Sequence, residues 1–316
     1  MNNLQSLSYY LPEFFLVGTI LSAVIVDLFL KAKDSHQVGI WVLGGLFLTL
    51  CSFQFIPEND ITSLFMNSLA FDPFARFFKI LVLVATGFII LISRESQELS
   101  NVRTGEYYML LGIMVFGMFL MASAIDLIMV YLAIEIVSIV SFILAGYLKD
   151  NKRSNESGLK YVIYGAFSSG LMLFGLSILF GVTGTTKFFE IRTVLGSANP
   201  DVFLAIVVAS ILILAGFGYK ISAVPFHFWT PDVYEGAPTP VTAYLSVAPK
   251  AAGFAILLRF FNDSLSDGGV IENLDFGYTG LPWAQLLAVL SLITMTLGNL
   301  VAIQQNSVKR MLAYSS

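Results

Sequence analysis

The sequence is poor in charged residues. Asp, Glu, Lys and Arg make up 12% of the 316 residues, whereas a soluble globular domain usually contains about 25%. Hydrophobic residues make up 57%, and the mean hydropathy is +0.81. A chain of this composition cannot hide its apolar surface from water, so the sequence predicts that its solvent is a lipid bilayer.

Cysteine and histidine are also scarce, which argues against several kinds of redox site. The single cysteine, Cys51, excludes an intramolecular disulfide and a four-cysteine iron–sulfur cluster. The two histidines, His36 and His227, fall in different segments, which disfavours a bis-histidine haem. The motifs of nucleotide, phosphate and zinc sites are absent, and no basic stripe suggests nucleic acid. We therefore expect no metal ion, redox cofactor or nucleic acid to bind this chain.

Long apolar stretches recur along the whole sequence at the length of a membrane-spanning helix. The connections between them are too short for a soluble domain, and the longest, Asn262–Leu281, is acidic and Gly-rich and predicts an exposed loop. A tenth stretch begins at Val308 and stops after barely two turns, as expected of a fragment of a longer chain. The sequence thus predicts an all-α polytopic membrane protein with one membrane domain, residues 1–316. The predicted spans are Leu11–Leu30, Val38–Ile56, Phe74–Ile92, Tyr107–Ala124, Leu127–Leu148, Tyr161–Val182, Val202–Val224, Pro238–Phe261 and Trp283–Gln304.

Lys and Arg residues predict the orientation, because they gather on the cytoplasmic side of membrane proteins. With the N-terminus outside, ten of them fall in inner connections and five in outer ones, and this bias favours that orientation. The inner set is Lys31, Lys33, Arg94, Arg103, Lys149, Lys152, Arg153, Lys160, Lys309 and Arg310. The outer set is Arg76, Lys79, Lys187, Arg192 and Arg259.

Three ionisable residues lie well inside predicted spans, namely Glu135, Lys220 and Lys250. A charge at that depth costs about 3 kcal/mol on insertion scales, so such residues persist when they are paired, hydrated or functional. One interpretation is a proton or ion pathway. The other is structural, with a Glu–Lys pair that fixes helix packing or a lysine that snorkels to the interface.

Glycine and proline accompany both buried lysines. The apolar run around Lys220 continues to Trp229, which is too long for one simple span, and Gly216, Gly218 and Pro225 supply the means to break it. A discontinuous helix places a charge and unpaired backbone groups in one protein-lined cavity, as transporters do. Lys250 directly follows Pro249, which removes a backbone donor and is expected to loosen the eighth span.

Polar residues near these positions leave alternatives open. His227, just beyond Pro225, is suited either to relaying protons or to anchoring at the interface between its aromatic neighbours. The nearby hydroxyls are expected mostly to bond back to their own helices, although they are also able to hold water. They are Ser138, Ser141, Ser168, Ser169, Ser222, Thr242 and Ser246.

Three segments closely resemble the subunit N family of bacterial NADH–quinone oxidoreductase, respiratory complex I. They are "KISAVPFHFWTPDVYEGAPTPVTAYLSVAPKAAGFAILLRF", "GEYYMLLGIMVFGMFLMASAIDLIMVYLAIEIVSIVSFILAGYL" and "ESGLKYVIYGAFSSGLMLFGLSILFGVTGTT". The sister subunits M and L and the Mrp-type antiporters share the outline, but "PDVYEGAPTPV" points to N. The resemblance runs almost from end to end.

The resemblance implies roles for four residues. In such subunits a glutamate on the fifth helix pairs with a lysine on a broken seventh helix, and Glu135 and Lys220 occupy those places. Lys250 matches a lysine on the eighth helix that continues the polar axis. Lys160 matches a further conduction lysine at the start of the sixth helix, although its position alone suits a snorkelling lysine. The stretches "EIVSI" and "GFGYK" depart from the common residues only by apolar or aromatic exchanges.

The resemblance also implies an architecture and a setting. It implies three N-terminal helices (1–105), a first five-helix repeat (106–262) and the start of an inverted second repeat (263–316). It implies a proton-translocating enzyme subunit of the bacterial cytoplasmic membrane, with no catalytic or redox centre of its own. NAD(H), FMN, iron–sulfur clusters and quinone would be held elsewhere in the complex, and subunits M and K and membrane lipid would be neighbours. The alternative function is a stand-alone Mrp-type cation/proton antiporter, and a third hypothesis is a purely structural spacer.

Overall fold

The computed structural model describes residues 3–31, 34–56, 61–100, 102–196, 202–265 and 283–316. Within these ranges nine helices are long and apolar enough to cross a membrane, which confirms the predicted all-α polytopic class. Lys33 and most of the Asn262–Leu281 loop lie outside the described residues. The long helices are α2 (Leu11–Phe29), α3 (Gln37–Ser52), α4 (Pro73–Arg94), α5 (Gly105–Ser123), α6 (Leu127–Ala145), α7 (Lys152–Thr183), α9 (Phe203–Ile221), α11 (Thr239–Phe260) and α12 (Trp283–Ile303).

Shorter elements join the long helices. The strands β1 (Thr62–Leu64) and β2 (Leu69–Phe71) form an antiparallel hairpin in which Leu64 pairs with Leu69. This hairpin was not predicted, because three residues per strand are too few for a recognisable alternation. The short helices are α1 (Asn3–Tyr9), α8 (Phe188–Gly196), α10 (Thr230–Gly236) and α13 (Val308–Ser315), with 3₁₀ turns at Phe53–Phe55 and Gln97–Leu99 and a π turn at Phe261–Leu265.

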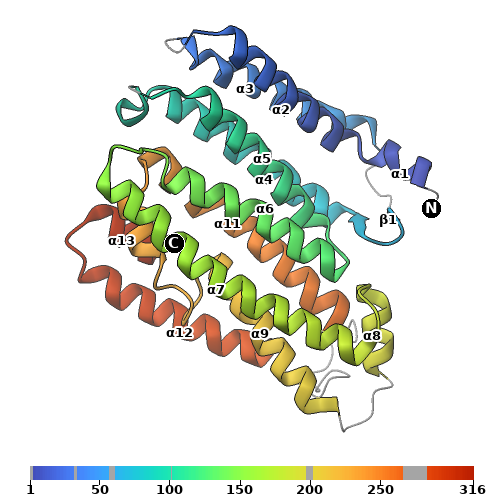
Figure 1. Cartoon of the computed structure of the whole chain (residues 1–316). Helices are drawn as coiled ribbons and strands as arrows, with labels where there is room; N and C mark the ends of the chain where they lie inside the picture. Colours follow the sequence, from blue (N-terminus) through green and yellow to red (C-terminus); the bar gives the residue numbers. More distant parts are fainter. Residues whose placement is uncertain (1–2, 32–33, 57–60, 101, 197–201, 266–282) are drawn as a thin grey trace.

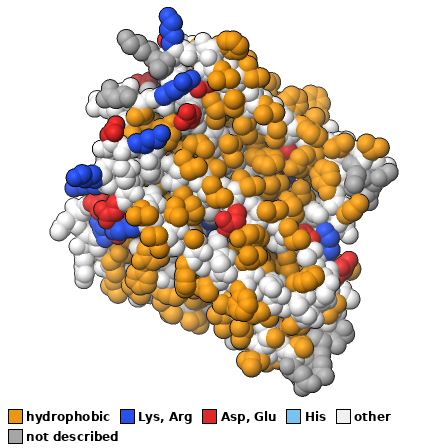
Figure 2. Space-filling view, in the orientation of Figure 1, with side chains coloured by type: hydrophobic (Ala, Val, Ile, Leu, Met, Phe, Trp, Pro, Cys, Tyr) orange, Lys and Arg blue, Asp and Glu red, His pale blue; other side chains and the backbone are white. Residues whose placement is uncertain are grey.

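The long helices run side by side and form one bundle (Figure 1). Helices α2 and α3 lie at one edge of the view and α9 and α12 at the other, with the rest between them. Helix α5 packs against α2, α3, α4, α6 and α11 and is therefore central. Hydrophobic side chains cover most of the visible face, with few charged side chains in the middle of it (Figure 2). This surface suits contact with lipid rather than water.

Polar caps set where several helices begin. The carboxylate of Asp72 accepts a hydrogen bond from Ala75 N (2.7 Å) at the start of α4, and Asp126 caps α6 through Ile128 N (2.8 Å). Asn151 caps α7 in the same way. As a result, α7 begins at Lys152 rather than at the predicted Tyr161.

The polar first turns of α7 are held by packing rather than by hydrophobicity. Ser154 Oγ donates to Ala145 O (2.8 Å) at the end of α6, and Ser157 Oγ donates to Val233 O (3.0 Å) in α10. These contacts satisfy small hydroxyls that water would otherwise solvate. A hydropathy window misses such a segment because its stability comes from tertiary contacts.

The predicted discontinuous seventh helix is confirmed. Helix α9 ends at Ile221 and α10 begins at Thr230, with an irregular segment, residues 222–229, between them. Ser222 adopts a left-handed conformation (φ 61°), and Ala223 N donates to Gly218 O (2.8 Å), which closes the last turn of α9. The Val224–Pro225 peptide bond is cis.

The predicted break residues are only partly right. Gly216 and Gly218 lie inside α9, where they leave room for neighbours: a Cβ on Gly216 would lie 2.5 Å from Met172 Sδ, and one on Gly218 2.6 Å from Phe226 Cδ2. They serve close packing and not helix breaking. Pro225 does lie in the break. Pro249 does not break α11, which continues through it from Thr239 to Phe260.

Candidate functional site

Lys220 lies in the last turn of α9, where the helix gives way to the break. Its side chain is buried, with 3% of the residue exposed, and its Nζ donates to Ser138 Oγ on α6 (3.2 Å). A cation at this end of a helix is favoured by the helix dipole. The end of α9 at the break therefore places Lys220 within hydrogen-bond distance of a buried polar partner, Ser138.

Glu135 lies one turn before Ser138 on α6. It is near enough to Lys220 to act on it electrostatically, but the expected direct ion pair is not formed, because Lys220 Nζ reaches Ser138 instead. Glu135 Oε1 is buried and, within the described part of the chain, has no hydrogen-bond partner. Sequence reasoning named Ser138 among several nearby hydroxyls but did not single it out as the partner of Lys220.

Lys250 lies on α11, the helix that packs against the last turn of α9. It is also buried (6% exposed), its Nζ donates to Ser316 Oγ (2.7 Å) and lies 5.6 Å from the centre of the Tyr234 ring. Gly253, one turn further along α11, faces Lys220: a Cβ there would lie 2.9 Å from Ile221 Cγ2 and 3.4 Å from Lys220 Cγ. One face of α11 thus carries Lys250 and also contacts Lys220.

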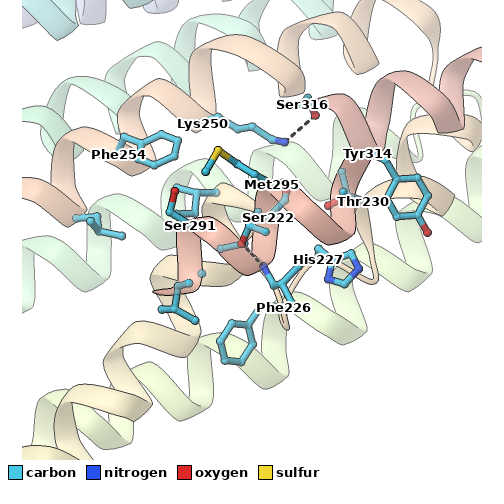
Figure 3. A pocket seen from close by; sticks show the side chains of 18 of the residues that line it. Ser222, Phe226, His227, Thr230, Lys250, Phe254, Ser291, Met295, Tyr314 and Ser316 are labelled. Carbon is cyan, nitrogen blue, oxygen red and sulfur yellow. Dashed lines mark hydrogen bonds between the residues drawn. The ribbon is translucent and has the colours of Figure 1, made fainter. Parts of the chain in front are cut away.

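A cavity of about 380 Å³ opens beside the break (Figure 3). His227 lies in its wall, 9% exposed, and its Nδ1 is buried without a partner among the described residues. This burial disfavours the interpretation of His227 as an interfacial anchor. The cavity brings together Lys250 and His227 but not Lys220. Its other polar lining residues are Ser222, Thr230, Ser291, Thr294, Tyr314 and Ser316.

Lys160 belongs to a separate cluster at the α10 end of the bundle. Its Nζ lies 2.7 Å from Asp232 Oδ2 and 2.7 Å from Glu156 Oε1, and 37% of its side chain is exposed. Arg310 of α13 shares Asp232 (2.6 Å) and also reaches Glu235 (3.1 Å). A second cavity, of about 280 Å³, lies among these residues. The structure therefore does not bring Lys160 together with Lys220 and Lys250.

The carboxyl of Asp232 is strongly influenced by its cationic neighbours. Partial burial acts to raise its pKa, but hydrogen bonds from Lys160 and Arg310 outweigh this effect and hold the pKa below its usual range. Asp232 is therefore a stable anion that connects α7, α10 and α13. Sequence reasoning missed it, because "TPDVYEG" offers no spacing that links it to Lys160 or Arg310.

Two buried ion pairs lie outside both cavities and were also missed. Lys79 Nζ binds Glu13 Oε1 (2.6 Å), and both residues are at most 4% exposed. Arg259, 5% exposed, makes a bidentate pair with Asp72 (2.8 and 2.9 Å). The orientation count had placed Lys79 and Arg259 in outer connections, whereas both lie inside helices, α4 and α11. The apolar residues around Lys79 were the available signal.

Of the singled-out hydroxyls that have an assigned partner, Ser141 and Ser246 bond back to their own helices, as expected, whereas Thr242 of α11 bonds to the backbone of α10. Ser141 donates to Val137 O, Ser246 to Ala243 O (2.8 Å) and Thr242 to Tyr234 O (2.9 Å). Ser138 differs from all three, since it serves Lys220. Among the residues that the structure describes, no group of three or more His, Cys, Asp or Glu side chains is placed to hold a metal ion.

A bundle of spanning helices, one of them broken beside a buried lysine, defines a polytopic membrane protein with a discontinuous helix, an arrangement that recurs in transporters. The comparisons agree with this class. Residues 124–316 match the family described as NADH:quinone oxidoreductase/Mrp antiporter, TM, and the chain belongs to this family.

Relatives with curated names are similar over nearly the whole chain. It is 49% identical to "NADH-quinone oxidoreductase subunit N 2" of Chloroherpeton thalassium, over 98% of this chain and 60% of the relative. It is 43% identical to "NADH-quinone oxidoreductase subunit N" of Anaeromyxobacter sp. (strain Fw109-5), over 99% of this chain and 62% of the relative. The chain thus spans about 60% of the length of these relatives.

Solved structures share the fold. A chain of respiratory complex I from Thermus thermophilus superposes with a TM-score of 0.75 at 28% identity, over 96% of this chain and 61% of that chain. A chain of the Mrp complex from Dietzia sp. DQ12-45-1b superposes with a TM-score of 0.76 at 25% identity, over 96% and 32%.

Proposed function

We propose that the chain is part of a subunit of the N type of bacterial NADH–quinone oxidoreductase and moves protons across the membrane. Electron transfer from NADH to quinone, in other parts of the complex, would drive this movement. The similarity to subunits of that name supports the assignment. The observation that carries the mechanism is the burial of Lys220 at the break, bonded to Ser138 with Glu135 one turn away.

Lys220 is the central proton carrier in this proposal. The attraction between Glu135 and a charge on Lys220 falls with distance, so a shift of α6 relative to α9 changes how firmly the lysine holds its proton. Lys250, on the adjoining face of α11, receives the proton next, and His227 lines the same cavity as Lys250. Lys160, at the partly exposed cluster with Asp232, exchanges protons near one membrane surface.

The setting follows from the same proposal. The N-terminus lies outside a bacterial cytoplasmic membrane, and the neighbours are other membrane subunits of the complex, M and K among them, with lipid around them. NAD(H), FMN, iron–sulfur clusters and quinone are bound by other parts of the complex. Residues 1–105 form the three-helix N-terminal part, 106–262 the first five-helix repeat and 263–316 the start of the second.

The test is proton pumping by the whole complex in sealed vesicles, with Lys220→Ala in the full-length subunit and NADH oxidation followed in parallel. We expect fewer protons per NADH at an unchanged level of assembled complex. Lys152→Ala is the matched control, because Lys152 is an exposed lysine on α7. Unchanged pumping in the Lys220 variant would end this mechanism.

The likeness to the Mrp complex favours one competing function, a stand-alone cation/proton antiporter. That function predicts sodium-dependent transport in vesicles that contain neither NADH nor quinone. A purely structural spacer would behave differently from both: Lys220→Ala would impair assembly, and whatever assembled would pump fully.

A further inference from the structure

The break between α9 and α10 has to satisfy its own backbone donors, because the helix cannot do so there. Ala223 N donates back to Gly218 O (2.8 Å), and Phe226 N donates to Ala223 O (2.7 Å). Val224 N, between them, points to a different element. Its partner is the hydroxyl of Thr294 on α12, at 3.1 Å.

The hydroxyl of Thr294 is the acceptor that the described structure gives to the N–H of Val224. The next residue, Pro225, has no N–H, so Val224 supplies the one backbone donor of this pair of residues. Val224 and Thr294 both line the cavity. The α12 residues Ser291 and Met295 line this cavity together with Ser222 and Phe226 of the break (Figure 3). A partly buried N–H that loses its acceptor is costly, so the Thr294 hydroxyl holds Val224 in place.

The position of Val224 links this contact to the charged site. It follows Lys220 by four residues. The Ala223 N–Gly218 O hydrogen bond closes the turn that contains Lys220, and Val224 comes directly after that turn. Fixing Val224 therefore fixes the end of the turn that carries Lys220. If the break moves freely, the last turn of α9 frays and the Lys220–Ser138 distance is no longer set.

We propose that Thr294 is a positioning residue: its hydroxyl caps the broken helix from α12 and holds Lys220 at Ser138. This inference rests on the proposed function of Lys220 in proton transfer. It gives α12 a direct mechanical link to the site, through a residue that carries no charge and never touches the proton carrier.

The cap itself is tested without any transport measurement, by hydrogen–deuterium exchange at the Val224 amide in the assembled complex. Thr294→Val keeps the shape of the side chain but removes the acceptor, and Thr294→Ser keeps the hydroxyl. We expect exchange to rise about fivefold or more in the valine variant, as for the loss of a hydrogen bond worth about 1 kcal/mol, and to return towards wild type in the serine variant.

Thr296→Val is the matched control on the same helix. The Thr296 hydroxyl donates to Leu292 O of α12 (2.7 Å), and the residue is exposed. Its loss should leave exchange at Val224 unchanged. Equal exchange in Thr294→Val and wild type would overturn the cap.

The positioning role is tested by protons pumped per NADH oxidised. We expect Thr294→Val to lower the ratio, Thr294→Ser to restore most of it, and Thr296→Val to leave it unchanged. Faster exchange at Val224 with a normal ratio would overturn the link to Lys220, provided that Lys220→Ala lowers the ratio in the same vesicles. A normal ratio in Lys220→Ala would instead reject the proposed function, and the exchange result would then still decide whether the cap exists.

Discussion

At the scale of single residues, the chain holds its buried charges in two different ways. The pairs Glu13–Lys79 and Asp72–Arg259 are direct and short, whereas Lys220 is held by the neutral hydroxyl of Ser138. A direct buried pair is rigid, because separating it leaves two desolvated charges. The hydroxyl of Ser138 holds Lys220 more weakly than a carboxylate would, which suits the proposed role of this lysine in taking up and releasing a proton.

Ser138 is therefore expected to matter for transport. Ser138→Ala removes the partner of Lys220 Nζ, and a hydrogen bond to a charged group contributes about 1.5–3 kcal/mol. We expect the rate of proton pumping to fall about tenfold, measured in sealed vesicles with NADH as the electron donor. Ser246→Ala, which removes a hydroxyl bonded only within α11, should pump normally. Normal pumping by Ser138→Ala would show that the serine has no part in proton transfer.

The Asp72–Arg259 pair should contribute to stability. Asp72→Asn leaves the buried guanidinium of Arg259 without its bidentate anion, and breaking a buried pair from one side costs about 3–5 kcal/mol. We expect a clear loss of thermal stability in detergent. Asp263→Asn tests the same arginine through its longer contact (3.7 Å), and the carboxylate there is 35% exposed. This second change should cost about 1 kcal/mol or less, and equal losses would contradict the assignment.

At the scale of elements, the close approach of α9 and α11 sets the geometry of the site. Gly253 allows this approach, because any Cβ there would meet Ile221 at 2.9 Å. Gly253→Val should push the helices apart, move Lys220 away from Ser138, and destabilise the protein by about 1–3 kcal/mol, a typical overpacking cost. The expected results are a lower unfolding temperature and reduced pumping.

Gly170→Val on α7 is the matched control for that change. Gly170 is exposed, and a Cβ on it would meet nothing within 4 Å. It alters intrinsic helix propensity in the same way without crowding a neighbour. If both variants lost the same stability, the effect would come from the helix itself and not from the α9–α11 contact.

Elements also show how far sequence reasoning reaches. The nine spans and the broken seventh helix followed from hydropathy and from the length of the run around Lys220, since both are local properties. The start of α7 did not, because tertiary hydrogen bonds hold it. The β1–β2 hairpin did not either, because its strands of three residues are too short to show an alternation. The break itself was placed too early: Gly216 and Gly218 read as breakers in sequence, but they lie in α9 to make room for Met172 and Phe226.

The same division applies to the site. Lys220, Lys250 and Glu135 were identified because a charge inside an apolar run is conspicuous in any sequence. Ser138 and Thr294 were not distinguished from the other hydroxyls, because only the packing of α6 and α12 against the break selects them. Asp232 was missed for a related reason, as its partners lie far away along the chain.

At the scale of the whole molecule, the region around Lys220 and the cluster around Asp232 differ in how firmly their charges are held. The Lys220 region is buried and weakly bonded, whereas the cluster of Lys160, Asp232 and Arg310 ties three helices together with short ion pairs. The second half of the broken helix, α10, is thus fastened to α7 and α13. Movement in the proposed mechanism should therefore occur at the α9 side of the break.

The pH dependence of stability tests this clamp. The pKa of Asp232 in the folded protein lies below its ordinary value of about 3.9. Its contribution to stability is therefore complete above about pH 4 and is lost as the pH falls through the lower, folded value. The group is partly exposed, so this contribution should be of order 1 kcal/mol. The measurement is the unfolding temperature of wild type and Asp232→Asn in detergent, between pH 7 and pH 3.

We expect the difference in unfolding temperature between wild type and Asp232→Asn to stay constant from pH 7 to about pH 5 and to shrink below pH 4. Glu235→Gln, which removes one contact to Arg310 but leaves both partners of Asp232 in place, should show a smaller difference from wild type at pH 7. The physical reason is that Asp232 contacts both Lys160 and Arg310, whereas the contact given for Glu235 in the described structure is to Arg310. A difference between wild type and Asp232→Asn that persists unchanged to pH 3 would mean that the anion of Asp232 does not clamp α10, and that the half-helix is held by packing alone.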